Sequence, residues 1–120
     1  MTQRFAAESF MAALTDPKLN HLLNDFCKGL QDLYGDRLVR LMLFGSYARQ
    51  EASDDSDLDI MVILKGSVSP GDEIFRMGPL KTTLNLQYNE LISVVPISEA
   101  DYRNRHTPLL EAVHQEGIPL

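Results

Sequence analysis

The sequence has a single cysteine, Cys27, so the chain cannot form an internal disulfide bond. An oxidising compartment would bring its fold no benefit, and the N-terminus lacks a signal-peptide pattern, so the cytoplasm is the expected location. No apolar run approaches the length that crosses a membrane, and no membrane association is expected. The residues around Cys27 are typical of a helix, in which a buried, unreactive thiol is the expected role.

Basic residues are also few. The chain has 11 Lys and Arg against 17 Asp and Glu, which gives a net charge of -6. The basic residues form no cluster, and tight binding to a nucleic-acid backbone needs a basic surface, so direct nucleic-acid binding is disfavoured. The histidines show no metal-ligand spacing among themselves and are interpreted as surface or packing residues. The acidic balance suits a divalent cation or a basic partner instead.

The length and composition predict one domain. A chain of 120 residues, 44% of them hydrophobic, fits a single domain over residues 1–120 with one core. Residues 1–16 could add an extra N-terminal helix. Asp16 and Pro17 then predict the N-cap and first position of an amphipathic helix, which Gly35 ends.

Later segments alternate between strand and helix patterns. Runs rich in large apolar or β-branched residues predict strands over residues 37–44, 58–64 and 91–97. A helix is expected over residues 72–87, and Pro79 should break or kink it. Ser98 and Thr107 predict the N-caps of two short helices, the second of which Gly117 ends. The resulting α/β (α+β) fold is a small mixed sheet flanked by helices.

The C-terminal residues are apolar. Leu110 and Val113 belong to a stripe on the last predicted helix, part of which is core. Residues 118–120 then end the chain as Ile-Pro-Leu, with no polar cap. Such an end could pack on another subunit, so a homo-oligomer or hetero-oligomer is expected.

Aspartates gather where the second strand begins. Side chains alternate along a strand, so Asp57 and Asp59 point to the same face. Two carboxylates this close repel each other and raise a pKa, unless a cation lies between them. Oxygen ligands without a nearby His or Cys favour Mg²⁺ over zinc. A solvated acidic turn is the alternative, and it describes Asp54 and Asp55 better than Asp57 and Asp59.

A Gly-Ser pair follows the first strand. Gly45 lets the backbone turn and approach a ligand closely, and the Ser46 hydroxyl can donate a hydrogen bond to a phosphate oxygen. Residues 48–51 could begin a short helix whose free N–H groups would bind an anion. Arg49 could contact phosphate, or pair with a neighbouring acid on the surface. Together with the two aspartates, this arrangement predicts a nucleoside triphosphate bound with Mg²⁺.

The spacing of these residues resembles a known signature. Gly45-Ser46, followed after ten residues by Asp57-Leu58-Asp59, is similar to the motif of the DNA polymerase β-like nucleotidyltransferases. The longer run GSYARQEASDDSDLDIMV resembles the minimal nucleotidyltransferases, short prokaryotic proteins that are often paired with a HEPN-domain toxin and in some cases act as antitoxins. The resemblance implies a nucleotidyltransferase fold for the chain.

The resemblance also implies roles for these residues. Asp57 and Asp59 would be catalytic and hold two Mg²⁺ ions, while Gly45 and Ser46 would bind the triphosphate of ATP, with Arg49 as a further nucleotide-binding candidate. The implied reaction moves AMP from ATP to a protein hydroxyl, which in antitoxin members is a tyrosine of the cognate HEPN-type toxin. A domain this small leaves its active face open, which favours a macromolecular acceptor.

The sequence departs from the family pattern at two positions. Gln50 occupies a place where the family commonly has glycine. The family usually carries a third aspartate on the strand after the Asp-x-Asp strand, and here that place falls on Ser93, which leaves Glu90, at the start of that strand, as the third catalytic candidate. Loss of the third carboxylate could lower the rate by about two or more orders of magnitude.

Two alternatives to an active antitoxin enzyme follow. One is a catalytically weak or inactive module that keeps the nucleotidyltransferase fold and neutralises a partner by binding. The other, an antibiotic-modifying adenylyltransferase, is weaker because such enzymes usually carry an additional helical domain.

Overall fold

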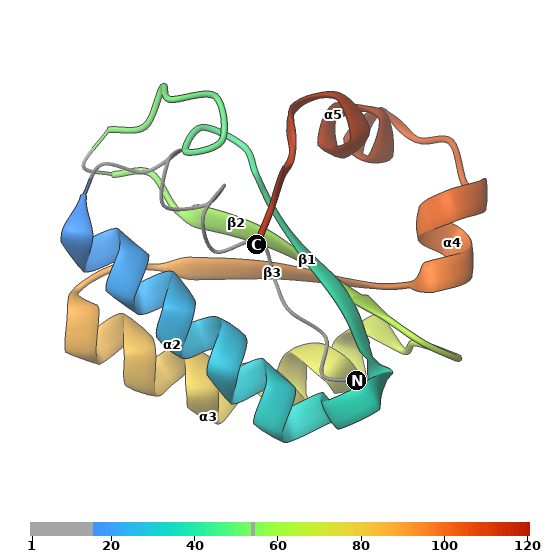
Figure 1. Cartoon of the computed structure of the whole chain (residues 1–120), viewed down its shortest axis with the longest axis horizontal. Coiled ribbons are helices and arrows are strands. Elements are labelled where there is room, and N and C mark those ends of the chain that lie inside the picture. The colour runs from blue at the N-terminus through green and yellow to red at the C-terminus, as the bar shows by residue number, and fades with distance from the viewer. Residues whose placement is uncertain (1–15, 54) are drawn as a thin grey trace.

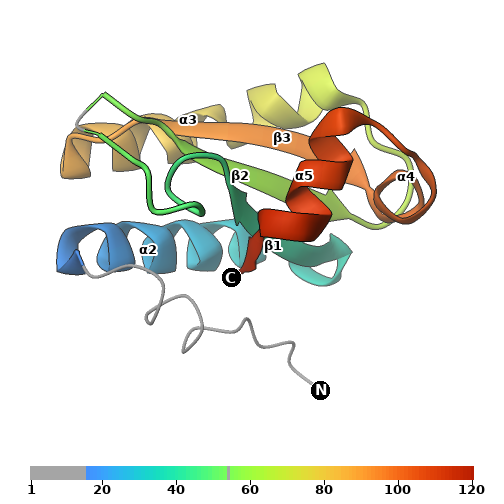
Figure 2. The ribbon, with the colours of Figure 1, turned by 90° about the horizontal axis from the view of Figure 1, so that it is seen from above.

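The structure, a computed structural model, describes residues 16–53 and 55–120. Its strands are β1 (Leu38–Phe44), β2 (Leu58–Leu64), β3 (Ile92–Ser98) and β4 (Ile118–Pro119). Its helices are α2 (Pro17–Tyr34), α3 (Pro70–Tyr88), α4 (Glu99–Asn104) and α5 (Pro108–Glu116), with the 3₁₀ turn η1 (Gly35–Arg37) after α2. The strands form one sheet, with α2 and α3 on one face and α4 and α5 towards the other (Figure 1, Figure 2).

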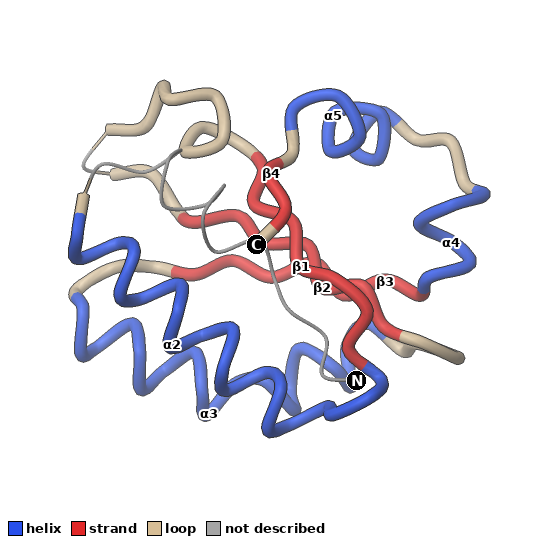
Figure 3. Tube along the Cα trace, viewed as in Figure 1, coloured by secondary structure: helices blue, strands red, loops and turns tan. Residues whose placement is uncertain are grey.

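The sheet is mixed, in the order β3-β2-β1-β4. β1 runs antiparallel to both β2 and β4, whereas β2 and β3 are parallel and are connected through α3 (Figure 3). Parallel neighbours need such a crossover, usually a helix. β3 lies at an edge of the sheet, where Pro96 does not have to donate a hydrogen bond to a further strand. This architecture confirms the predicted mixed sheet flanked by helices.

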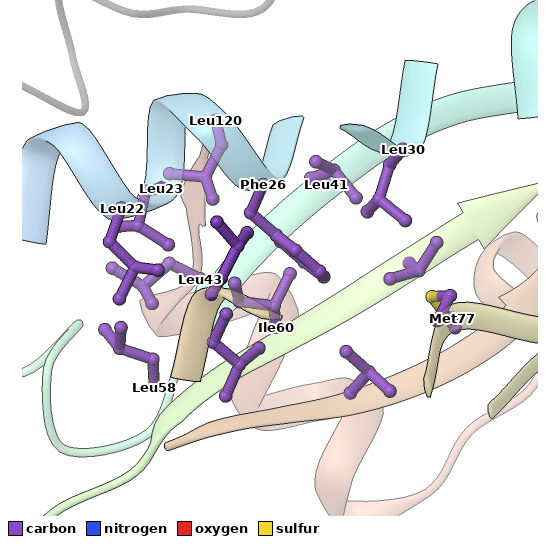
Figure 4. Close-up of a cluster of buried hydrophobic side chains, with 14 of the residues drawn as sticks. Leu22, Leu23, Phe26, Leu30, Leu41, Leu43, Leu58, Ile60, Met77 and Leu120 are labelled. Atoms are coloured by element: carbon purple, nitrogen blue, oxygen red, sulfur yellow. The ribbon is translucent and has the colours of Figure 1, made fainter. Parts of the chain in front are cut away.

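α2 forms because its ends are capped and one of its faces is apolar. The Asp16 carboxylate accepts a hydrogen bond from the Lys18 N–H at 2.9 Å, and Pro17 occupies the first turn, as predicted. Gly35 ends the helix with φ 55°, also as predicted. The buried residues of α2 are Leu19, Leu22, Leu23, Phe26, Leu30 and Tyr34. This face packs on the sheet and on α3 (Figure 4).

Alternation along β2 divides the core between the two faces of the sheet. Leu58 and Ile60 point into the main core, under α2 and α3 (Figure 4). Met61 points the other way, into a smaller cluster with Leu110 of α5. Asp59 is two residues before Met61 on the same strand, so its side chain points to the same face of the sheet, towards α5 and away from the main core.

α3 continues through Pro79, so the helix does not break there, and the kink named as the alternative stays a prediction. Pro79 cannot donate a hydrogen bond to the carbonyl of Phe75, one turn earlier. Both residues lie on the exposed side of the helix, where water can bond to that carbonyl. Buried Met77 and Leu84, one on each side of Pro79, hold the helix against the core.

The apolar C-terminus belongs to this chain's own sheet. Ile118 and Pro119 form β4 beside β1, and the N–H of Leu120 donates to the carbonyl of Leu41 at 3.0 Å. The Leu120 side chain is 2% exposed and lies in the main core (Figure 4). The expectation that this end packs on another subunit is therefore wrong, because the free edge of β1 pairs with it instead.

The caps expected near the C-terminus are confirmed. The Ser98 hydroxyl accepts a hydrogen bond from the Asp101 N–H at 3.1 Å and begins α4. The Thr107 hydroxyl accepts from the Leu110 N–H at 3.1 Å and begins α5, which Gly117 ends. Local side chains therefore set the bounds of both helices.

Other expectations have mixed outcomes. The extra N-terminal helix falls almost wholly on residues 1–15, and it lies outside the described residues, as does Asp54.

Cys27 is largely buried in α2, and burial raises the pKa of its thiol to about 12, which agrees with an unreactive role. In the part of the chain that the structure describes, no helix has the length and apolar character to span a bilayer.

Candidate active site

The site begins where β1 ends. Gly45 has φ 76°, a conformation that L side chains rarely adopt. A Cβ at this position would collide with Oδ2 of Asp59, whose carboxylate lies against the turn. The strands are paired so that Phe44 stands opposite Asp59, which brings the end of β1 to the start of β2. The positive φ therefore favours glycine at position 45, and a larger residue there would have to displace the carboxylate of Asp59.

The segment after Gly45 folds as turns and loop, drawn tan in Figure 3. The Arg49 N–H donates to the carbonyl of Gly45 at 3.1 Å, which closes one helix-like turn around partly exposed Ser46. The short helix expected over residues 48–51 is wrong. Gln50 has φ 60°, in the left-handed region, and this conformation prevents a helix from continuing. It also explains why glycine is suited to position 50.

Asp57 and Asp59 lie on either side of the first residue of β2, and both are partly exposed. Burial raises the pKa of Asp59, the charge of Asp57 raises it further, and Arg49 opposes the rise. The two carboxylates are therefore close enough to repel each other, and a cation bound between them would relieve that repulsion. Their oxygen donors suit a hard divalent ion such as Mg²⁺.

Arg49 lies near this pair, but other acids contact it. Its Nε is 2.7 Å from Oε1 of Glu51, and its Nη1 is 3.5 Å from Oε2 of Glu116. The side chain of Arg49 is 43% exposed, and exposed ion pairs of this kind contribute little to stability. The guanidinium could therefore exchange a carboxylate for a phosphate at small cost, so both interpretations of Arg49 agree with its position.

Ser93 is the register partner of Asp59 on the neighbouring strand. Buried Ile92 and Val94 point into the main core, so Ser93 points to the opposite face, as Asp59 does. A hydroxyl thus lies beside Asp59, at the position where the resemblance led us to expect a third acid. Among the described residues, no group of three or more His, Cys, Asp and Glu side chains is placed to hold a metal ion.

Glu90 lies in the turn between α3 and β3 rather than on the strand. Its carboxylate is 2.9 Å from Nζ of Lys18, at the start of α2. Together with Asp57, it lines an open polar cavity of about 320 Å³ that Asn85 and Asn89 also border. The structure thus brings Glu90 towards Asp57, while Ser93 takes the place beside Asp59.

Sequence reasoning missed Lys18, Asn85 and Asn89. The Asn85 side-chain oxygen accepts a hydrogen bond from the Ile92 N–H at 3.0 Å, which fixes the start of β3. Asn89 adopts φ 53° and ends α3. Lys18 reaches the cavity region from α2, so no local pattern could have connected it with the aspartates.

Comparison with known proteins identifies the family. The chain matches the family described as "Polymerase beta, Nucleotidyltransferase" over residues 32–120. The matched segment includes the Gly-Ser turn and both aspartates of the site. The chain therefore belongs to the polymerase β nucleotidyltransferase family.

Two relatives align over part of their length. Protein adenylyltransferase MntA of Thermococcus cleftensis is 42% identical over 52 residues, which cover 43% of this chain and 50% of MntA. MJ1305 of Methanocaldococcus jannaschii, assigned as a protein adenylyltransferase, is 40% identical over 52 residues, which cover 43% of this chain and 35% of that protein. The chain thus matches between about a third and a half of the length of these relatives.

Solved structures share the fold. One, assigned as a minimal nucleotidyltransferase, gives a TM-score of 0.57 at 26% identity, over 85% of this chain and 92% of the other. A chain of a toxin–antitoxin solved with AMP-PNP gives a TM-score of 0.59 at 24% identity, over 80% of this chain and 69% of that chain. These findings confirm the resemblance to the minimal nucleotidyltransferases.

Proposed function

We propose that this protein is a Mg²⁺-dependent nucleotidyltransferase that transfers AMP from ATP to a hydroxyl group of a partner protein. The observation that carries the proposal is the contact between Gly45 and Asp59, because it sets a close backbone turn against a pair of carboxylates. Membership of the nucleotidyltransferase family supports the reaction class. The relatives named as protein adenylyltransferases support AMP as the transferred group and a protein as the acceptor.

The residues of the site have separate roles in this proposal. Asp57 and Asp59 would hold two Mg²⁺ ions, and Gly45 and Ser46 would bind the triphosphate. When bound, Mg²⁺ supplies the positive charge that activates the acceptor hydroxyl and stabilises the departing pyrophosphate. The Gly45 turn lets phosphate oxygens approach the backbone, and the Ser46 hydroxyl donates a hydrogen bond to one of them. Arg49 adds a positive charge at the same end of β1.

Glu90 is the proposed base that takes the proton from the acceptor hydroxyl. It lines the same cavity as Asp57, so a hydroxyl entering that cavity would meet both carboxylates. The ion pair with Lys18 holds the Glu90 side chain at this position.

A cognate HEPN-type toxin is the proposed acceptor, and the cytoplasm is the proposed location. The similar toxin–antitoxin structure supports a toxin partner. The cavity beside Asp57 is open, as is a second cavity of about 420 Å³ that Lys18 and Glu90 line. Open cavities suit the side chain of a second protein, so this protein and its toxin would form a hetero-oligomer.

The test is transfer of label from ATP to the partner. The protein is incubated with Mg²⁺, ATP labelled at its α-phosphate, and the protein encoded next to it in the genome. The wild type is expected to label this partner. The double variant Asp57→Asn with Asp59→Asn is expected to lower the rate at least about a hundredfold.

The matched control is the double variant Asp32→Asn with Asp36→Asn. It removes two exposed carboxylates from α2 and η1, away from β2, and is expected to keep full transfer. An unlabelled partner in the wild-type reaction would contradict the proposal. Equal labelling by the Asp57 and Asp59 double variant would contradict it as well.

A second function, neutralisation by binding alone, is favoured by the hydroxyl of Ser93 beside Asp59. The test uses cells that express the partner toxin. It compares how well these cells are protected by the wild type and by the double variant Asp57→Asn with Asp59→Asn. Equal protection by a variant that still binds the partner would support binding alone. Lost protection with retained binding would support transfer.

A further inference from the structure

We infer that position 93 sets the metal affinity of this site: with serine there, the site holds a divalent cation weakly until a triphosphate binds with it. The inference rests on the proposed function for the location of the metal site. It names Ser93 as the residue that makes metal binding by this site weaker than metal binding by a site with three carboxylates.

Ser93 occupies the nearest place to Asp59 on the neighbouring strand. The two residues are partners in the parallel ladder, and adjacent strands lie about 4.8 Å apart. Ile92 and Val94 are buried in the main core, so Ser93 points to the same face as Asp59. A carboxylate at position 93 would therefore reach the space beside Asp59.

Three acids near the site pair with basic side chains. Glu90 pairs with Lys18 at 2.9 Å, in the turn before β3. Glu51 and Glu116 both pair with Arg49. Within the described residues, no three acidic, His or Cys side chains form a group that could hold a metal ion. Asp57 and Asp59 are therefore the two carboxylates, among the described residues, that the inference assigns to the ion.

The number and charge of oxygen ligands determine how tightly such a site binds a divalent ion. Two carboxylates leave most coordination positions to water, so the free ion is expected to bind with roughly millimolar affinity. Triphosphate oxygens add ligands and negative charge. The ion and the triphosphate should therefore strengthen each other's binding, because such coupling is reciprocal.

The first experiment measures binding of Mn²⁺ alone by electron paramagnetic resonance of the free ion. The Ser93→Asp variant is expected to bind Mn²⁺ at least about tenfold more tightly than the wild type, since it adds a charged ligand. Ser93→Ala should bind Mn²⁺ as weakly as the wild type, because in this inference the Ser93 hydroxyl is not a metal ligand. An unchanged affinity in Ser93→Asp, or a wild type that binds at about 10 µM or below, would overturn the inference.

Glu90→Gln tests whether another acid supplies the third ligand. The inference expects this variant to bind Mn²⁺ as the wild type does, because Glu90 pairs with Lys18 instead. Weaker binding of Mn²⁺ by Glu90→Gln would assign the third ligand to Glu90 and overturn the inference.

A second experiment uses only the wild type and therefore does not depend on how Ser93→Asp folds. Thermal unfolding is followed at about 0.1 mM Mn²⁺, with and without a non-hydrolysable ATP analogue. Mn²⁺ alone should leave the Tm unchanged, whereas both together should raise it above the analogue alone. A rise with Mn²⁺ alone would contradict the inference, as would the same Tm for the analogue with and without Mn²⁺.

Transfer activity separates this inference from the proposed function. Tighter Mn²⁺ binding by Ser93→Asp, with no labelling of the partner by any form, would support the inference and contradict the proposed function. Labelling of the partner by the wild type, with an unchanged Mn²⁺ affinity in Ser93→Asp, would support the proposed function and contradict the inference.

Discussion

At the scale of single residues, positive φ angles shape the start of the site. Gly45 and Gln50 have φ 76° and 60°, within one short segment after β1. A non-glycine residue in this region costs on the order of 1 kcal/mol, and such strain is often found at functional sites. At Gly45, a Cβ would in addition meet the carboxylate of Asp59, which would have to move.

We expect Gly45→Ala to lower the free energy of unfolding by about 1–3 kcal/mol. The new Cβ would meet Oδ2 of Asp59 and would also hold an unfavourable φ. Urea denaturation measures the change. Gly71→Ala is the matched control, because a Cβ there meets open space at an ordinary φ in the first turn of α3. Equal losses at both positions, or none at position 45, would disprove the steric argument.

At the scale of elements, a buried carboxylate joins α2 to α3. Glu73 of α3 is 4% exposed and accepts a hydrogen bond from the hydroxyl of Tyr34 at 2.9 Å. It also pairs with Arg37 at 3.4 Å and with Arg76 at 3.2 Å. Burial acts to raise the pKa of Glu73, but the hydrogen bonds from Tyr34 and Arg76 and the charges of both arginines outweigh it, so the pKa is lowered.

This network makes stability depend on pH. Because the pKa of Glu73 is lower in the folded state, its contribution is complete above the unfolded value of 4.5 and is lost as the pH falls through the folded value. Glu73→Gln is expected to cost about 1–3 kcal/mol at neutral pH and to reduce the loss of stability in acid. Urea denaturation at neutral pH and below pH 4.5 measures both effects.

Glu99→Gln is the control for this prediction. It removes an ion pair with Arg103, whose side chain is largely exposed, and should change stability by less than about 0.5 kcal/mol. A Glu73→Gln variant with the same acid sensitivity as the wild type would show that the buried carboxylate does not determine it.

At the scale of the whole molecule, the C-terminal segment completes the sheet and the core. β4 adds a strand beside β1, and the side chain of Leu120 enters the cluster beneath α2 (Figure 4). Residues from both ends of the described chain therefore share one core, which links the stability of the C-terminus to that of the site-bearing strands.

We expect Leu120→Ala to lower the free energy of unfolding by about 2–4 kcal/mol, because it leaves a cavity in the main core. Guanidinium denaturation measures the loss. Leu109→Ala, on the 41% exposed Leu109 of α5, should cost less than about 1 kcal/mol. Losses of similar size in the two variants would mean that burial of Leu120 does not stabilise the fold.

Local patterns were enough to predict helices α2 to α5, strands β1 to β3 and the residues at the centre of the candidate site, but not β4. The cap at Asp16, the turn at Gly45 and the alternation around Asp57 and Asp59 each depend on residues a few positions apart. Interactions over such short separations follow from backbone geometry and side-chain chemistry. The bounds of β2 were predicted correctly, and those of β1 and β3 to within one residue at each end.

Contacts between distant segments were determined by packing, which local patterns do not encode. The pairing of Glu90 with Lys18 joins the start of α2 to the turn before β3, and residues 118–120 paired with β1 rather than with a second subunit. α3 stayed continuous because its buried residues hold it across Pro79. The register that sets Ser93 beside Asp59 likewise depends on how β3 packs against β2. Such choices are decided by which apolar surfaces can be buried together, and that depends on the whole fold.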